Sequence, residues 1–306
     1  MRVAVTGATG FIGRAIVRAL QDRGDSIVAL TRHAESARRV LGEIVQVVPW
    51  TPDYDASWGN KLAGCVAVIN LAGEPIFGRR WTQAQKQRIR ESRTRAVAGI
   101  IEAIRRLDRP PAILINASAI GYYGPHGDEA LNEASAAGND FLAEVCRAWE
   151  QEVETAKVDH LRTVRIRTGI VLGADGGALK RMVPLFKMFL GGLLGSGQQW
   201  MSWIHLEDLV RMYLWALDNP QVEGPLNGTA PNPVTNREFS RTLGRTLGRP
   251  AWLPAPAFAV RRAFGEAANV ILQGQRVLPV RSLELGFTFQ FPMLKEALDD
   301  ILYPPR

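Results

Sequence analysis

The chain has 306 residues, of which 46% are hydrophobic and 22% charged, a composition typical of a folded globular protein and not of a disordered chain. It contains no uninterrupted apolar run of the ~18 residues that a membrane span needs, and its histidines and cysteines lack metal-ligand spacing. The net charge of +7 is spread along the sequence without a nucleic-acid-binding motif, so we expect no membrane, metal or nucleic acid among its ligands.

The expected setting is the cytoplasm, because the first residues form a strand pattern and not a secretory leader. Cys65 and Cys146 show no pairing pattern, so we expect reduced, buried thiols. A small-molecule substrate is compatible with these features, and the oligomeric state is left open.

A glycine-rich turn follows the first predicted strand, residues 2–6, and precedes an apolar-periodic helix that ends near Gly24. Gly7 closes the turn, Gly10 allows close approach of a ligand, and Gly13 lets the helix lie close to the strand. The helix N-terminus then offers free N–H groups to a pyrophosphate. The predicted dinucleotide contacts here are Gly7, Thr9, Gly10, Phe11, Ile12 and Gly13.

Strand and helix patterns then alternate, which predicts an α/β fold: a Rossmann-type doubly wound parallel sheet covered by helices on both faces. Further strands are expected at 26–31, 43–48, 66–71, 112–118 and 161–167, with helices at 82–107 and 140–157.

After residue 173 the pattern changes to a smaller, mostly helical C-terminal lobe with glycine-rich joints. Helices are expected at 207–218, 235–247, 257–273 and 293–302. We therefore divide the chain into a cofactor domain, residues 1–173, and a substrate lobe, residues 174–306, with parts of 203–230 completing the sheet.

The second strand ends at Thr31 and Arg32, where an NAD-preferring site usually has an acid that binds the ribose. Arg32 instead offers a planar cation suited to a 2′-phosphate, and Arg38 and Arg39 add positive field. The sequence therefore predicts NADP(H) in preference to NAD(H), although a solvated surface arginine is the plain alternative.

The fourth strand ends in Leu71, Ala72 and Gly73, whose small residues are expected to line the cofactor. Arg93 falls in the apolar stripe of the helix predicted at 82–107. An inward guanidinium needs a polar or anionic partner, either the cofactor pyrophosphate, a substrate anion or a carboxylate in the core.

His205 follows an aromatic run that contains Trp200 and Trp203. The histidine is either an acid or base or, as we favour, a structural residue at a helix start. The tryptophans either wall a substrate pocket or pack in the core, which is their commoner use.

These motifs resemble the extended short-chain dehydrogenase/reductases, and more specifically an atypical branch called the NAD-dependent epimerase/dehydratase or epimerase family. The segments that carry the resemblance are 6–13, 70–73, 118–124, 167–173, 191–205, 203–209 and 227–236. Residues 252–302 resemble a small domain appended in this branch. The resemblance implies an NADP(H)-binding oxidoreductase or nucleoside-diphosphate-sugar epimerase.

The chain departs from that pattern where active members have a Tyr-x-x-x-Lys pair. The corresponding positions hold Phe141 and Val145, or Leu142 and Cys146, and the serine position falls on Ala119. The remaining catalytic candidates are Ser118, which is also a cofactor candidate, Tyr122 and Glu74, whereas Tyr123 is expected to pack. Two functions stay open: an enzyme with a rearranged site, which we favour, and a non-catalytic NADP(H)-binding sensor.

Overall fold

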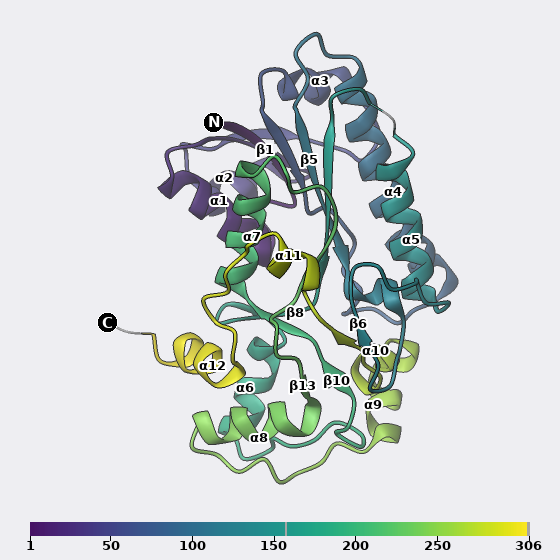
Figure 1. Cartoon of the computed structure of the whole chain (residues 1–306), viewed down its shortest axis with the longest axis vertical. Coiled ribbons are helices and arrows are strands. Elements are labelled where there is room, and N and C mark those ends of the chain that lie inside the picture. Colours follow the sequence, from purple (N-terminus) through teal and green to yellow (C-terminus); the bar gives the residue numbers. More distant parts are fainter. Residues whose placement is uncertain (157, 305–306) are drawn as a thin grey trace.

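A computed structural model describes residues 1–156 and 158–304 (Figure 1). Lys157, predicted as the end of a helix, and residues 305–306 of the predicted second lobe lie outside the described residues.

The centre of the molecule is a seven-stranded sheet in the order β12-β7-β5-β4-β1-β2-β3, and every pairing within it is parallel. Its strands are β1 (Arg2–Thr6), β2 (Ser26–Thr31), β3 (Gln46–Pro49), β4 (Ala67–Asn70), β5 (Ile113–Ala119), β7 (Arg162–Thr168) and β12 (Gly224–Gly228). Strand order reverses between β1 and β4, the place where such sheets bind ligands. The predicted Rossmann-type fold is confirmed, and β12, which lies within the residues 203–230 expected to complete the sheet, is its edge strand next to β7.

Two sets of helices cover the two faces of this sheet (Figure 1). One face carries α1 (Phe11–Asp22), α2 (Ala34–Leu41) and α7 (Leu206–Asp218), and the other carries α3 (Ala56–Gly59), α4 (Gln83–Arg105) and α5 (Phe141–Glu154). Successive strand residues pack on opposite faces of the sheet, because side chains along a strand point alternately to its two sides. Val3 and Val5 belong to the hydrophobic cluster under α1, α2 and α7, and Ala4 belongs to the cluster under α3, α4 and α5.

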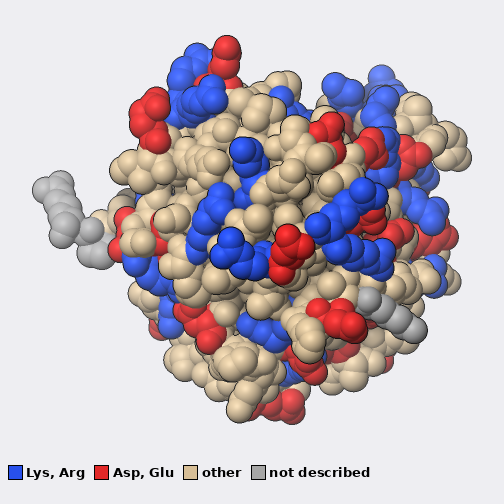
Figure 2. Space-filling view, turned by 90° about the horizontal axis from the view of Figure 1, so that it is seen from above, with Lys and Arg blue, Asp and Glu red and all other residues tan. Residues whose placement is uncertain are grey.

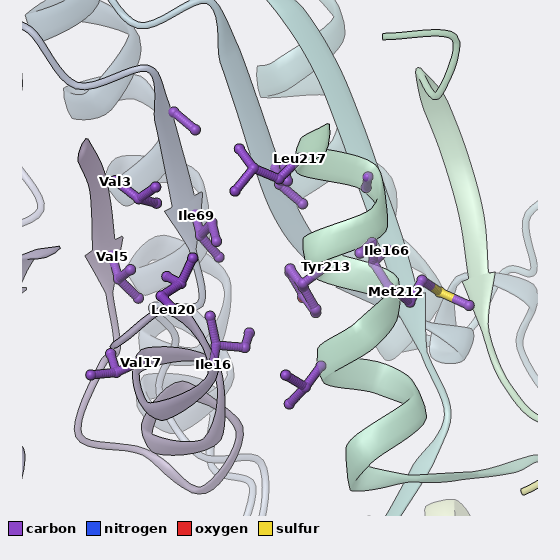
Figure 3. Packing of buried hydrophobic residues seen from close by; sticks show 14 of the residues in the cluster. Val3, Val5, Ile16, Val17, Leu20, Ile69, Ile166, Met212, Tyr213 and Leu217 are labelled. Carbon is purple, nitrogen blue, oxygen red and sulfur yellow. The ribbon is translucent and has the colours of Figure 1, made fainter. Parts of the chain in front are cut away.

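Figure 3 shows the first cluster, in which side chains of α1 and α7 pack against the sheet. Ile16 and Leu20 of α1 and Tyr213 of α7 are fully buried there. Burial of each large apolar side chain contributes about 1.5–3 kcal/mol, so this packing holds α1, and the turn before it, firmly in place.

Two helices on the opposite face, α4 and α5, begin at capping residues. The Thr82 side chain accepts a hydrogen bond from the backbone N–H of Gln85 before α4, and Asp140 accepts one from Ala143 before α5. Such caps satisfy N–H groups that the first helical turn leaves unpaired.

Most of the remaining elements form a smaller lobe beyond one end of the sheet (Figure 1). Its short strands are β6 (Ala130–Leu131), β8 (Ile170–Gly173), β9 (Gly176–Gly177), β10 (Trp200–Met201), β11 (Trp203–His205), β13 (Val234–Thr235) and β14 (Arg276–Val277). Its helices are α6 (Leu179–Lys187), α8 (Asn236–Thr246), α9 (Ala257–Phe264), α10 (Asn269–Leu272) and α12 (Leu294–Leu302). Helix α11 (Val280–Glu284) instead lies beside β12 at the edge of the central sheet. A separate core that includes Trp203, Phe239 and Leu298 holds much of this lobe together.

The single helix expected over 257–273 is wrong. Helix α9 ends at Phe264, a 3-10 turn spans Gly265–Ala268, and α10 follows. Gly265 has a φ of 60°, a left-handed conformation that ends helices and that glycine adopts at little cost.

On the face shown in Figure 2, acidic side chains lie among the basic ones and do not leave one continuous basic surface. Within residues 1–156 and 158–304, no helix has both the length and the hydropathy to cross a membrane. The same residues contain no cluster of three or more His, Cys, Asp or Glu side chains arranged to hold a metal ion.

Candidate functional site

The glycine turn between β1 and α1 is folded tightly against its neighbours. Gly7 has a φ of 64°, and its carbonyl oxygen accepts a hydrogen bond from the Gly10 N–H at 3.0 Å. A Cβ on Gly7 would lie 2.8 Å from the Leu71 carbonyl oxygen, and one on Gly13 would lie 2.2 Å from the Gly7 carbonyl oxygen. Only glycine therefore lets α1 and the end of β4 approach the turn this closely.

The N-terminus of α1 has the properties of an anion site. Its N-cap, Gly10, makes no side-chain cap, and the first turn contains no acidic residue. Thr9 and Gly10 are exposed, and a Cβ on Gly10 would meet nothing within 4 Å except the Gly7 carbonyl oxygen. Because free N–H groups and the helix dipole favour negative charge here, the residues fit the pyrophosphate of a dinucleotide.

Two of the predicted contacts, Phe11 and Ile12, direct their side chains into the protein. The Phe11 ring packs against the β8–β9 hairpin, where a Cβ on Gly176 would lie 2.4 Å from it. Ile12 packs against the core between α1, α7 and the sheet. The predicted cofactor contacts of Phe11 and Ile12 would therefore be made by their backbone groups.

A buried row of polar side chains, which the sequence analysis missed, runs across the ends of β1, β4 and β5. The Thr6 hydroxyl donates to Asn70 Oδ1 at 2.6 Å, and Asn70 Nδ2 donates to Asn116 Oδ1 at 2.6 Å. All three side chains are fully buried. The signal in the sequence is an asparagine near the end of each of two otherwise apolar strands.

This row fixes the segment after β4. Backbone N–H groups of Leu71 and Ala72 donate to the Thr6 hydroxyl at 3.1 and 3.2 Å. The structure therefore brings the predicted Leu71–Gly73 segment beside the glycine turn, where it adjoins any ligand on α1.

On the other side of β1, Thr31 and Arg32 end β2 as expected. The Thr31 hydroxyl accepts a hydrogen bond from the His33 N–H at 3.3 Å, and Arg32 is exposed. Among the described residues Arg32 has no hydrogen-bond or ion-pair partner, so its guanidinium is available to a ligand phosphate.

Arg93 of α4 lies beside Gly73 and reaches α5. Its Nη1 donates to the backbone carbonyls of Glu74, at 3.1 Å, and Ile89, at 2.8 Å, and its Cζ lies 5.1 Å from the centroid of the Trp149 ring. Burial lowers the pKa of Arg93 from its ordinary value. No carboxylate within the described residues lies within 4.0 Å of it, so the alternative of a core carboxylate partner is wrong and backbone carbonyls take that place.

Ser118 belongs to a buried ionic network. Its hydroxyl donates to Glu150 Oε1 at 2.6 Å, and Glu150 also binds Arg167 through two hydrogen bonds of 2.9 and 2.8 Å. Burial acts to lower the pKa of Arg167, but the hydrogen bonds and charge of Glu150 raise it overall. The serine hydroxyl is thus directed at α5, and its roles in catalysis and cofactor binding stay predictions.

The two neighbouring tyrosines have different surroundings. Tyr123 is fully buried, and its hydroxyl donates to Asn227 and accepts from Arg167. Burial raises the pKa of Tyr123 to about 12, which suits the packing role expected of it. Tyr122 is half-buried, with the Arg167 guanidinium 3.5 Å from its ring centroid.

Glu74 is half-buried at the start of the loop before α4, and its backbone N–H donates to the Ser92 hydroxyl at 2.9 Å. Its catalytic role, like that of Tyr122, stays a prediction.

The residues of the aromatic run before α7 make structural contacts. His205 is the N-cap of α7, and its Nδ1 accepts a hydrogen bond from the backbone N–H of Glu207 at 3.1 Å. The centroid of its ring lies 4.0 Å from the ring centroid of Phe291. Trp203 is fully buried and donates to the Asn232 carbonyl. Trp200 is half-buried and donates to Asp128.

Comparison with known proteins places these features in a family. Residues 3–227 match the NAD dependent epimerase/dehydratase family, and residues 255–301 match a domain of unknown function, DUF1731. The chain belongs to the NAD dependent epimerase/dehydratase family. The resemblance to its atypical branch, with an appended C-terminal domain, is confirmed.

Several epimerase family proteins are similar over nearly the whole chain. A chloroplastic SDR39U1 homolog of Arabidopsis thaliana is 45% identical, covering 99% of this chain and 87% of that protein. Epimerase family protein YfhF of Bacillus subtilis is 38% identical, covering 99% and 98%.

Among solved structures of epimerase family proteins, human SDR39U1 (isoform 2), described with NADPH, has a TM-score of 0.88 and 35% identity over 98% of this chain and 99% of that one. A UDP-glucuronic acid 4-epimerase from Bacillus cereus, described with UDP-glucuronic acid and NAD, has a TM-score of 0.79 but 17% identity, covering 99% and 98%, and shows the shared fold alone.

Proposed function

We propose that this epimerase family protein is an NADP(H)-dependent oxidoreductase or epimerase that acts on a small molecule. The observation that carries the proposal is Arg32 directly after β2, one strand away from the glycine turn, which is exposed and has no partner among the described residues. An arginine there suits the 2′-phosphate that distinguishes NADPH from NADH. The NADPH described with the human relative supports the same cofactor.

The residues proposed to hold the cofactor lie on elements that the packing of the protein itself fixes. The N-terminus of α1 binds the pyrophosphate, the Leu71–Gly73 segment lines its path, and Arg32 binds the 2′-phosphate. The cofactor, when bound, supplies reversible hydride transfer.

The usual positions on α5 provide no proton-transferring group, because Leu142 and Cys146 have no hydroxyl or ammonium. We assign this role to the Tyr122 hydroxyl, since Tyr122 is half-buried at the end of β5 beside the cationic Arg167. Tyr123 does not serve, because its hydroxyl is buried and bonded on both sides.

The first test is a titration of the purified protein with NADPH and with NADH, followed by nicotinamide fluorescence and by quenching of its eight tryptophans. We expect NADPH to bind about tenfold or more tightly than NADH, since a charge-assisted contact contributes roughly 1.5–3 kcal/mol. Equal affinities would remove the specificity assignment, and binding of neither would remove the proposed function.

A further inference from the structure

Helix α5 provides no charge where related enzymes have a lysine. The positions that match the usual Tyr-x-x-x-Lys pair are Leu142 and Cys146, and a Cβ on Gly121 would lie 3.3 Å from Leu142 Cβ and 3.9 Å from Cys146 Sγ. Burial, together with the charge of Glu150, raises the pKa of Cys146 to about 12, so its thiol is neutral.

A different cation lies beside this part of α5, and it comes from α4. Arg93 has its Cζ 5.1 Å from the ring centroid of Trp149, which lies three residues after Cys146 on the same helix. A Cβ on Gly73 would lie 3.1 Å from Arg93 Cζ, nearer than to Nη2 or Nε, so Gly73 covers a flat face of the guanidinium.

One edge of that guanidinium has no protein partner. Nη1 donates to the carbonyls of Glu74 and Ile89, whereas Nε and Nη2 find no acceptor among the described residues. The Nε–Nη2 edge of arginine presents two parallel N–H groups that match a pair of oxygens. Arg93 is half-buried, so this free edge is open to an oxygen-rich ligand.

The sheet order indicates which half of the cofactor meets this edge. Arg32 ends β2 on one side of β1, whereas Gly73 follows β4 on the other side, and α5 covers the same face beyond it. A dinucleotide that spans the switch between β1 and β4 with its 2′-phosphate at Arg32 therefore has its nicotinamide half beside Gly73.

We propose that Arg93 binds the two hydroxyls of the nicotinamide ribose, and so supplies from α4 the positive charge that α5 lacks. The proposal rests on the proposed function, because it requires that NADPH occupies the site. In this proposal the partner of Arg93 is the nicotinamide ribose, whereas the sequence pattern had suggested the cofactor pyrophosphate or a substrate anion.

The test compares NADPH with 2′-phosphoadenosine 5′-diphosphate, which retains the 2′-phosphate and both phosphates of the pyrophosphate and lacks the nicotinamide ribose. Binding of both is measured by calorimetry for the full chain and for Arg93→Met and Arg32→Ala, with Arg90→Met, an exposed arginine of the same helix, as the control. We expect Arg93→Met to weaken NADPH binding about tenfold or more and to leave binding of 2′-phosphoadenosine 5′-diphosphate unchanged, and Arg32→Ala to weaken binding of both.

Two results would overturn the proposal: equal weakening of both ligands by Arg93→Met, which indicates a contact with the adenosine or pyrophosphate part, or no weakening of either. Thermal unfolding of the unliganded variants separates loss of fold from loss of contact. If Arg93→Met does not fold, Arg93→Lys decides, since it keeps the charge without the two-pronged edge and must still weaken NADPH alone. Failure of the unaltered chain to bind either ligand would instead refute the proposed function.

Discussion

The Thr6 hydroxyl donates to Asn70 Oδ1 at 2.6 Å, between residues that face each other on the parallel strands β1 and β4. The same hydroxyl oxygen accepts the backbone N–H groups of Leu71 and Ala72. One buried hydroxyl thereby couples the strand before the glycine turn to the segment expected to line the cofactor.

Replacement of Thr6 by valine tests this coupling. The variant keeps the shape of the side chain but removes the hydroxyl from the buried backbone N–H groups, so we expect a loss of about 1–3 kcal/mol in the free energy of unfolding. Urea denaturation measures this, with Thr51→Val, at an exposed position, as the control. A loss no larger than that of the control would show that the row does not fix the segment.

Arg32→Ala tests cofactor choice. We expect NADPH binding to weaken by roughly 1.5–3 kcal/mol and NADH binding to stay nearly constant, because only NADPH carries the 2′-phosphate. The NADPH preference of the unaltered chain should also shrink as salt concentration rises, since the contact is exposed and screened. Equal losses for the two cofactors would contradict the assignment.

Glu150→Gln tests the ionic network that holds Ser118. Both Glu150 and Arg167 are almost fully buried, so removal of the carboxylate charge leaves a buried guanidinium uncompensated. We expect a loss of about 3–5 kcal/mol in the free energy of unfolding, measured by denaturant titration. Glu152→Gln, on the same helix, is the control; a similar small effect in both variants would show that the pair contributes little.

The two thiols provide a test of burial. Burial raises the pKa of Cys65 and, with Glu150, raises that of Cys146 to about 12, so neither forms the reactive thiolate near neutral pH. We expect a thiol reagent at about pH 8 to modify neither residue in the folded protein and both in denaturant. Rapid modification of either thiol in the folded state would contradict the packing described for α5 or β4.

His205 gives a pH dependence with a defined sign. Burial lowers the pKa of His205 from 6.5, although Asp300 and Asp208 act to raise it. The unfolded chain therefore takes up a proton near pH 6.5 that the folded chain does not, and stability falls as the pH drops below that value. His205→Asn keeps a side chain able to cap α7 without this titration. We expect a smaller loss of unfolding free energy between about pH 6.5 and pH 5; an unchanged slope would assign the acid sensitivity to other groups.

Local sequence signals were sufficient for the features that local physics controls. Gly7, Gly10 and Gly13 between a strand and a helix specify a turn that no other residue allows, and alternating apolar strands and helices specify a doubly wound sheet. Arg32 was identified because the end of β2 is a fixed place in that fold. The helix over 257–273 was mispredicted because its apolar pattern continues across Gly265, where the backbone conformation changes.

What the sequence by itself determined is thus the fold, the family and the glycine turn, because these depend on short-range patterns of glycine and apolar residues. Only the tertiary structure decided which polar groups face one another. It paired Thr6 with Asn70, directed Ser118 to Glu150, and left one edge of Arg93 free beside Gly73. Thr6 and Asn70 are 64 positions apart, Ser118 and Glu150 are 32 apart, and Arg93 is 19 from Glu74, whose carbonyl it binds. The geometry of these contacts depends on how the strands pair and how α4 and α5 pack against the sheet, which no local pattern specifies.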